Sequence, residues 1–287
     1  MATEERAETM VCYRHPNHET AVACSSCGRP ICPDCMVFAA VGIKCPECAG
    51  RATGAKKTAQ RIGAAAGQGA GAYATKTLIG LNVAVYLVQI AQANSIDGIG
   101  GTIFLRGYLN GPLVADGDWW RLVTSAFLHA SPIHILFNMA MLWWFGAPLE
   151  ALIGRWRFLA VYFVSILAGA AGALIVSPTQ ATVGASGAVF GILGAGIVLE
   201  RRQIYVFGGS ALLVAGFNLV LSFVISNVSV GGHIGGLVGG MLAMLAMSHF
   251  GRRHMLYGRA DAATVAGLVG VAVLSVVVAY ARVRGYA

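Results

Sequence analysis

The chain has 287 residues, of which 57% are apolar and only 11% charged. Soluble globular proteins carry about 25% charged residues, so this composition predicts a helical membrane protein instead. The net charge of +8 comes without a basic stripe interleaved with aromatic residues, so we expect no nucleic-acid partner. The apolar segments are too long for outer-membrane strands of ~10 residues. No short apolar segment follows Met1, so a cleaved signal peptide is not expected.

The cysteines are confined to the N-terminal part of the chain. All seven lie between positions 12 and 48, mostly in pairs with two intervening residues, and Cys12 stands at that spacing from His15. Such pairs converge on tetrahedral zinc. A disulfide framework is the alternative, but seven is an odd number of thiols. The sequence therefore predicts a module with two structural zinc ions and eight ligands, namely Cys12, His15, Cys24, Cys27, Cys32, Cys35, Cys45 and Cys48.

The order of these pairs favours cross-bracing, in which the first and third pairs share one ion and the second and fourth share the other. His18 is an alternative to His15, which we prefer for its spacing. A module of about 40 residues contains too little apolar material to fold unaided, so metal binding and folding should be coupled. Its need for reduced thiols places residues 1–50 in the cytosol.

The module resembles a B-box-type zinc finger. With every ligand position filled, the resemblance implies binding of a cytoplasmic protein partner rather than catalysis. Residues 51–75, rich in Gly, Ala and Lys, predict a flexible basic linker close to the membrane. The remaining domains expected are a transmembrane core over 76–250, and over 251–287 a cytoplasmic loop with an additional transmembrane helix.

Seven apolar segments approach the ~20 residues that a membrane span requires. They cover residues 77–94, 132–149, 157–177, 183–199, 204–225, 231–249 and 262–281. With a cytosolic N-terminus, 16 of the 20 Lys and Arg residues lie on the cytoplasmic side. This asymmetry follows the positive-inside rule. We therefore expect a multi-pass protein of the plasma (inner) membrane with a cytoplasmic N-terminus.

A few polar residues interrupt these segments, and an ionisable residue inside a membrane span suggests function by default. Ser186 lies in the sequence Gly184-Ala185-Ser186-Gly187. His233 lies in the sequence Gly231-Gly232-His233-Ile234-Gly235-Gly236. His134 and Asn138 are one helical turn apart. Ser186 and His233 each follow a polar residue by six positions, which predicts a depth of ~9 Å below the outer helix ends. The neighbouring glycines would let the two helices approach closely, bringing hydroxyl and imidazole within hydrogen-bond distance.

Each of these residues also has an ordinary structural explanation. An intramembrane serine commonly bonds its own helix backbone, glycine repeats commonly serve only helix packing, and a single histidine is as often structural as functional. Their convergence at one depth on three segments favours a site. A transporter or metal handler using His134 and His233 is an alternative, but it predicts acidic residues at the bilayer midplane, and none is evident. Glu150 and Glu200 map to cytoplasmic ends, so a Ser-His dyad without an acid is expected.

Together with Trp120-Arg121, these motifs resemble the rhomboid family of intramembrane serine proteases over about residues 75–250. The resemblance implies an all-α, rhomboid-like six-helix bundle, to which the zinc module and a seventh C-terminal transmembrane helix are additions. It also implies hydrolysis of peptide bonds in or near transmembrane segments of membrane proteins, mostly single-pass. Catalysis would use no cofactor. A catalytically inactive rhomboid-like protein that binds transmembrane clients is the alternative.

The resemblance also implies a role for each matching residue. Ser186 would be the nucleophile and His233 the general base. His134, Asn138 and the backbone N–H of Ser186 would stabilise the oxyanion. Phe190, four residues after the serine, would stack on the base where some relatives have tyrosine. The active site would open to the extracytoplasmic side, within the lipid bilayer.

Overall fold

The computed structural model describes residues 10–38, 42–50, 71–225, 228–248 and 262–286. The chain divides into two compact units, Met1–Lys57 and Thr58–Ala287. Most of the predicted linker, residues 51–70, lies outside the described residues, as does the predicted cytoplasmic loop from 251 to 261.

The first unit consists of short elements around a core of cysteines. Strand β1 (Met10–Val11) pairs antiparallel with β2 (Glu19–Thr20), and β3 (Val37–Phe38) pairs antiparallel with β4 (Ile43–Lys44). A 3-10 turn, η1 (Pro33–Cys35), and a short helix, α1 (Pro46–Gly50), are the other elements among its described residues. Among the described residues of this unit, Ile31 alone is a large apolar side chain fully buried with the cysteines. Two-residue strands with such a small core cannot stabilise a fold alone, which agrees with coupling of folding to metal binding.

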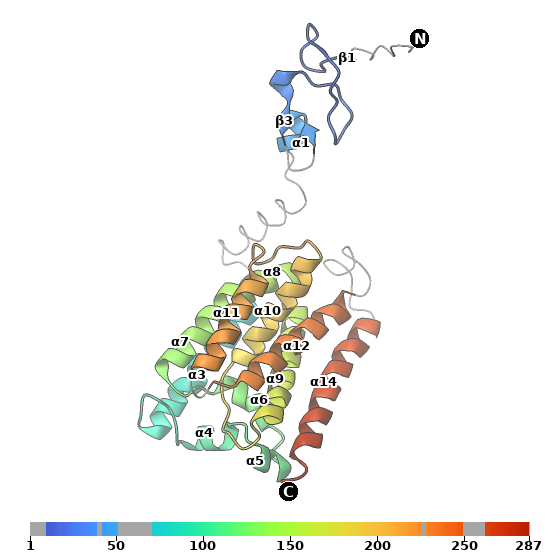
Figure 1. Ribbon diagram of the computed structural model, residues 1–287. Coiled ribbons are helices and arrows are strands. Elements are labelled where there is room, and N and C mark those ends of the chain that lie inside the picture. Colours follow the sequence, from blue (N-terminus) through green and yellow to red (C-terminus); the bar gives the residue numbers. More distant parts are fainter. Residues whose placement is uncertain (1–9, 39–41, 51–70, 226–227, 249–261, 287) are drawn as a thin grey trace. The chain divides into compact units, whose positions relative to one another are not determined.

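The second unit is a bundle of helices (Figure 1). Its elements are α3 (Tyr73–Ala93), α4 (Thr102–Gly107), α5 (Gly111–Ala115), α6 (Arg121–Thr124), η2 (Ser125–Phe127), α7 (Pro132–Met141), η3 (Leu142–Gly146), α8 (Ala147–Ile153), α9 (Arg155–Val176), α10 (Ser186–Arg201), α11 (Ala211–Val224), α12 (Val230–Met247) and α14 (Ala262–Val283). Helices α7, η3 and α8 follow one another without a break, and η3 has π-helical bonding.

Each of the seven predicted apolar segments overlaps a helical segment, although residues 183–185 and 204–210 lie outside α10 and α11. Five helical stretches are long and apolar enough to cross a membrane, among the residues described: α3, Pro132–Ile153, α9, α12 and α14. Helices α10 and α11 are shorter, with 16 and 14 residues. The structure therefore supports an all-α polytopic membrane protein, and two of the seven predicted spans are shorter than a full span.

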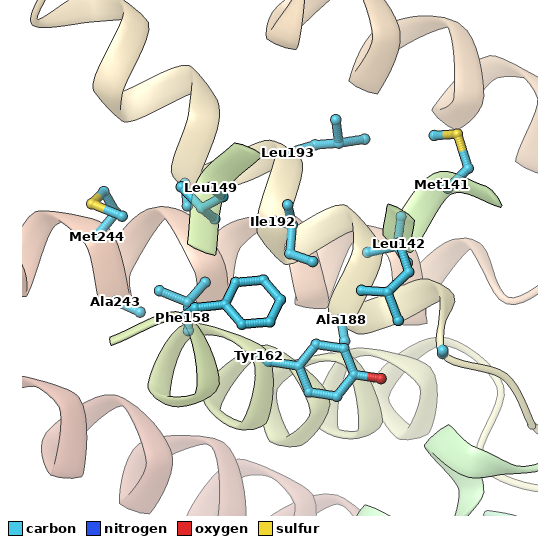
Figure 2. Packing of buried hydrophobic residues seen from close by; sticks show 14 of the residues in the cluster. Met141, Leu142, Leu149, Phe158, Tyr162, Ala188, Ile192, Leu193, Ala243 and Met244 are labelled. Carbon is cyan, nitrogen blue, oxygen red and sulfur yellow. The ribbon is translucent and has the colours of Figure 1, made fainter. Parts of the chain in front are cut away.

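Helix α9 lies at the centre of the bundle and packs against α10, α12 and α14. Phe158 and Tyr162, both fully buried, project from it. Figure 2 shows their rings beside Ala188 and Ile192 of α10. Helix α14 lies along the bundle (Figure 1), where Tyr280 is in ring contact with Trp119 of the segment before α6. Helix α14 thus packs against the segment between α3 and α7 as well as against α9 and α12.

Glycines let α12 approach two helices at once. A Cβ at Gly235 would strike the carbonyl oxygen of Ala168 in α9, and a Cβ at Gly236 would strike that of Gly187 in α10. One turn further on, a Cβ at Gly240 would strike the carbonyl of Gly191. In a bilayer, close packing of this kind substitutes for the hydrophobic effect between helices.

Two glutamates hold helix starts in place. Glu150 is 1% exposed and accepts hydrogen bonds from the N–H groups of Ala74 and Thr75 and from the Thr75 hydroxyl, at 2.8–2.9 Å. Glu200 accepts from the N–H groups of Gly209 and Ala211, at 3.1 Å, around the start of α11. Carboxylates at helix N-termini satisfy donors that have no partner within the helix.

The segment between α3 and α7 is organised by Arg121. Its side chain is 5% exposed, forms an ion pair with Asp118, and donates to the carbonyl oxygens of Leu105 and Tyr108 at 3.0 and 2.9 Å. The indole N–H of Trp120 donates to the carbonyl of Arg106 at 2.9 Å. The Trp120-Arg121 pair therefore joins the start of α6 to the segment around α4.

Candidate active site and candidate metal centres

The sequence analysis predicted that Ser186 lies six residues inside a helix. That prediction is wrong, because Ser186 is the first residue of α10. Residues 177–185 are not helical: α9 ends at Val176, Pro178 follows, and Gly184 has a φ of +121°. A residue with that φ cannot continue an α-helix. The N–H of Gly184 donates to the Ser125 carbonyl at 2.9 Å, which anchors the turn before the serine. Ser186 is half-buried at this helix start.

His233 also lies in the first turn of its helix, not six residues below the end. Helix α12 begins at Val230 and is capped by Ser229, whose hydroxyl accepts the N–H of Gly232 at 3.1 Å. His233 is 8% exposed. Its ring stacks on that of Phe190 with centroids 4.2 Å apart and an interplanar angle of 18°. Phe190 lies one helical turn after Ser186 on α10.

Helices α10 and α12 cross next to both polar residues. Gly187, which follows Ser186, faces Gly232, which precedes His233: a Cβ on Gly187 would lie 3.4 Å from the Gly232 carbonyl oxygen. Gly236, one turn after Gly232, meets the Gly187 carbonyl. The backbones carrying the serine and the histidine are therefore in van der Waals contact at this crossing.

His134 lies in the first turn of α7 and faces the turn before Ser186. A Cβ at Gly184 would stand 2.7 Å from His134 Nε2 and 3.8 Å from Ser186 Oγ. A side chain at position 184 would fill the space between these two groups. Ser131 caps α7 by accepting the His134 N–H at 3.2 Å, which fixes where this first turn begins.

Asn138 lies one turn beyond His134 and is 3% exposed. Its amide nitrogen donates to the His134 carbonyl at 2.9 Å. An Asn amide carries two N–H donors, so one of them remains for another acceptor.

A small cavity adjoins the serine. It has a volume of about 30 Å³ and is lined by Ser125, Ser186 and Ser229 together with glycines that include Gly184 and Gly232. A cavity needs roughly 10–15 Å³ and several polar partners to hold a water molecule. This one meets both conditions directly beside the Ser186 hydroxyl.

Two residues that the sequence analysis did not single out support the histidines. Gln89 of α3 accepts the N–H of His129 at 3.1 Å and donates to its carbonyl at 3.0 Å. The His129 ring is fully buried, in contact with the His134 ring at a centroid distance of 5.0 Å. Neither of its ring nitrogens has a hydrogen-bond partner within the described part of the chain.

The second such residue is Ser222 of α11, whose Oγ lies 2.6 Å from His233 Nδ1. The sequence feature that could have pointed to Ser222 is its position as a polar residue inside the apolar segment 204–225. By itself that signal is ambiguous, because an intramembrane serine commonly bonds its own helix, as Ser222 also does to the Asn218 carbonyl at 2.8 Å.

The first unit brings its eight predicted ligands into two groups. Within each group the ligating atoms all lie within 4.8 Å of one another. One group is Cys12, His15, Cys32 and Cys35, and the other is Cys24, Cys27, Cys45 and Cys48. These are the two sets that cross-bracing predicts. His18 falls in a three-residue group with Asp34 and Cys32, in which both His18 and Asp34 are exposed and Cys32 is shared with the first group, so the geometry favours His15.

The distances within these groups suit zinc. Tetrahedral zinc with bonds of about 2.3 Å separates two sulfur ligands by ~3.8 Å, and Cys27 Sγ lies 3.8 Å from Cys45 Sγ. His15 Nδ1 lies 3.9, 3.2 and 3.4 Å from the sulfur atoms of Cys12, Cys32 and Cys35. The donor set and its spacing therefore fit two ions, each held by four ligands.

The thiols themselves show why a cation belongs there. Backbone hydrogen bonds, chiefly at Cys45, lower the pKa of Cys24 to about 6, although burial opposes them. Burial and the neighbouring Cys12 and Cys32 thiols raise the pKa of Cys35 to about 11. Crowded thiols cannot all ionise together unless a positive ion compensates their charge, and a zinc ion would supply that charge.

Comparison with known proteins points to one class of membrane protein. Residues 116–250 match the family model described as the Rhomboid domain. This region contains all five candidate catalytic residues, from His134 to His233. The match supports the rhomboid family for this part of the chain.

Several curated relatives are named as rhomboid proteases or putative rhomboid proteases. The chain is 33% identical to rhomboid protease GluP of Bacillus subtilis over 150 residues, covering 51% of this chain and 29% of that protein. It is 37% identical to the putative rhomboid protease YdcA of B. subtilis over 126 residues, covering 42% and 63%. It is 32% identical to rhomboid protease AarA of Providencia stuartii over 165 residues, covering 46% and 57%. The chain thus spans less than two thirds of each relative, and the comparisons support a membrane protease at the level of the family.

Proposed function

We propose that this protein is an intramembrane serine endopeptidase whose transmembrane core, residues 76–250, hydrolyses peptide bonds in or near transmembrane segments of other membrane proteins. The observation that carries the proposal is the crossing of α10 and α12 at Gly187, Gly232 and Gly236. Ser186 and His233 adjoin this crossing, and Phe190 stacks on the His233 ring. The match to rhomboid proteases supports the same assignment.

In the first half of the proposed reaction, the Ser186 hydroxyl attacks the carbonyl carbon of the scissile bond. His233 accepts the hydroxyl proton through Nε2 as the new carbon–oxygen bond forms and charge moves to the carbonyl oxygen. His134, Asn138 and the Ser186 N–H donate hydrogen bonds to this oxyanion. Loss of one such donor typically lowers the rate by 10²–10³. The carbon–nitrogen bond then breaks, and His233 returns the proton to the leaving nitrogen.

In the second half, water hydrolyses the acyl-enzyme ester. His233 takes a proton from the water as its oxygen attacks the ester carbonyl, the ester bond breaks, and the proton passes to the Ser186 oxygen. The cavity of about 30 Å³ beside Ser186 supports this step, because it is polar and large enough for a water molecule. Polar groups at membrane depth are tolerated where they line such a space.

The substrates inferred are transmembrane proteins, chiefly single-pass, that approach through the lipid bilayer. Cleavage would fall near their outer ends, where a helix that unwinds readily exposes its peptide bonds. The distribution of Lys and Arg supports a multi-pass protein of the plasma membrane with a cytoplasmic N-terminus and a site open to the extracytoplasmic side.

The decisive experiment uses the purified full chain in detergent with a single-pass model substrate. Wild-type protein is expected to cleave it, and Ser186→Ala to abolish cleavage while leaving the fold intact. Ser275→Ala, a buried serine on α14, serves as the matched control and should cleave normally. Activity that survives in Ser186→Ala would end the assignment. Binding without cleavage by folded wild-type protein would favour the alternative of an inactive client-binding protein.

We also infer that residues 1–50 form a cytoplasmic module with two structural zinc ions that binds a protein partner. The linker expected over 51–75 is shorter than predicted, because α3 already begins at Tyr73. Residues 251–287 add a loop and a seventh helix to the core. Because the module holds none of the proposed catalytic residues, its deletion should leave bond cleavage intact and change substrate choice or regulation. Loss of all activity from folded protein lacking residues 1–50 would contradict this division.

A further inference from the structure

His233 has a hydrogen-bonding partner that the proposed dyad does not include. Ser222 Oγ lies 2.6 Å from His233 Nδ1, and the two residues are 4% and 8% exposed. We propose that Ser222 is a positioning residue, which holds the His233 imidazole with Nδ1 protonated and Nε2 free to accept the Ser186 proton. This inference rests on the proposed function and adds a third side chain, from a third helix, to its machinery.

The direction of the bond follows from proton counting. A serine hydroxyl has one proton to donate and two lone pairs with which to accept. Ser222 Oγ lies 2.8 Å from the Asn218 carbonyl oxygen, which can only accept. If the hydroxyl proton points to this carbonyl, both short contacts are hydrogen bonds, with Nδ1–H as donor to Ser222. If it points to Nδ1 instead, two oxygen lone pairs face each other across 2.8 Å without a proton between them. The first arrangement is the favourable one.

This arrangement selects the tautomer that catalysis needs. A neutral imidazole protonated at Nδ1 presents the lone pair of Nε2, the form in which histidine acts as a general base. When Nε2 takes the Ser186 proton, the ring becomes positively charged and its bond to Ser222 becomes charge-assisted and stronger. Ser222 thereby steadies the ring in both protonation states.

A hydroxyl suits this position better than an acid would. In the histidine triads of soluble proteases a carboxylate orients the imidazole, but an ionised carboxylate inside a bilayer is costly. The two glutamates of the described core, Glu150 and Glu200, are engaged at the starts of α3 and α11. Ser222 supplies orientation without a buried negative charge.

His233 is therefore held on two sides by different helices. Phe190 of α10 lies flat against the ring face, and Ser222 of α11 bonds the ring edge at Nδ1. The stack restricts tilting of the ring, and the hydrogen bond restricts rotation within its plane. Together the two contacts leave Nε2 with one direction in which to accept a proton.

A purely structural role is the competing explanation, because Ser165 and Ser275 make the same bond to the carbonyl four residues earlier. The test therefore compares Ser222→Thr, which keeps the hydroxyl, with Ser222→Val, which has nearly the same shape without it. Ser222→Ala is added because it cannot overpack the site, and Ser275→Ala is the matched control. Each full-length variant is purified, checked for helicity and thermal unfolding, and assayed on the single-pass model substrate.

We expect Ser222→Ala and Ser222→Val to lower kcat about 10-fold, because the hydrogen bond between His233 and Ser222 is stronger once the ring is charged than in the resting enzyme. KM should stay unchanged. Ser222→Thr should lie within about threefold of wild type and Ser275→Ala should match it. Nitrogen-15 NMR of labelled histidine, with His233→Ala used to assign the signal, should show Nδ1–H in wild type and a tautomer mixture in Ser222→Ala.

Folded Ser222→Ala protein with wild-type kcat, or with an unchanged His233 tautomer, would overturn this inference. That result is distinguishable from failure of the proposed function, which would appear as cleavage by Ser186→Ala. If Ser186→Ala is inactive and Ser222→Ala is normal, the protease assignment stands and Ser222 is only a helix-packing residue.

Discussion

The imidazole of His233 lies flat on the ring of Phe190, with centroids 4.2 Å apart and planes inclined by 18°. Phe190 belongs to the same helix as Ser186, one turn further along. A single helix therefore carries both the proposed nucleophile and the surface that supports the proposed base. Any movement of α10 relative to α12 would change both relationships together.

This stacking predicts a graded response to substitution at position 190. An aromatic pair contributes about 0.5–1.5 kcal/mol beyond its buried area. Phe190→Leu should therefore lower kcat by up to ~10-fold, whereas Phe190→Tyr keeps the stack and should stay within about threefold of wild type. Cleavage kinetics on a model substrate measure both. Equal activity of the Leu and Tyr variants would show that the ring contact has no catalytic value.

The crossing of α10 and α12 predicts strong sensitivity at Gly236. A Cβ added at this position would meet the backbone carbonyl of Gly187. The backbone cannot rotate away from such a contact as a side chain can. Gly236→Ala should destabilise the protein by about 1–3 kcal/mol and lower kcat/KM, because the helices must separate beside Ser186 and His233.

Gly216→Ala on α11 is the matched control for that experiment. A Cβ there has nothing within 4 Å, and alanine favours helix by up to about 1 kcal/mol over glycine. Thermal unfolding in detergent and cleavage kinetics give the two readouts. Similar behaviour of the two alanine variants would mean that the close crossing is unimportant.

Substitution of Glu150 is expected to lower the stability of the protein rather than its catalytic rate. Its carboxylate is buried and accepts three hydrogen bonds at the start of α3. Glu150→Gln replaces one acceptor oxygen by a donor facing N–H groups, at a cost of about 1–3 kcal/mol or more. The melting temperature should fall while kcat of the folded protein is retained.

Glu200→Gln is the comparison for Glu150→Gln. Glu200 caps α11 at a more exposed position, so water can replace part of the lost bonding and the fall in melting temperature should be smaller. A melting temperature unaffected by Glu150→Gln, or a larger effect at Glu200, would count against this account.

The two ligand groups predict two zinc ions per chain by elemental analysis. His15→Ala should lower the content and destabilise the first unit, because three thiols remain at one site. His18→Ala should retain both ions. Removal of zinc by a chelator should unfold the first unit, as followed by proteolysis. Loss of an ion in His18→Ala but not in His15→Ala would reverse the ligand assignment.

Much of this architecture can be predicted from the sequence because it depends on local or periodic patterns. Runs of apolar residues predict the helical segments, and cysteine spacing predicts which thiols can meet on one ion, because the knuckle between paired ligands is only two residues long. The predicted start of α10 was wrong, also for a local reason. Apolar residues continue through Val183 and Ala185, but Gly184 has a positive φ, so the helix cannot extend back through it.

What the sequence alone determined is the membrane class, the ligand sets and the polar side chains available for chemistry. The tertiary structure decided which of those side chains touch: that Ser222 reaches His233, that Gln89 holds His129, and that His134 faces the turn before Ser186. Hydrophobic periodicity tells which face of a helix avoids water, but nearly every face of a membrane helix is apolar. The pairing of faces therefore depends on close packing between distant segments, and only the folded bundle contains that information.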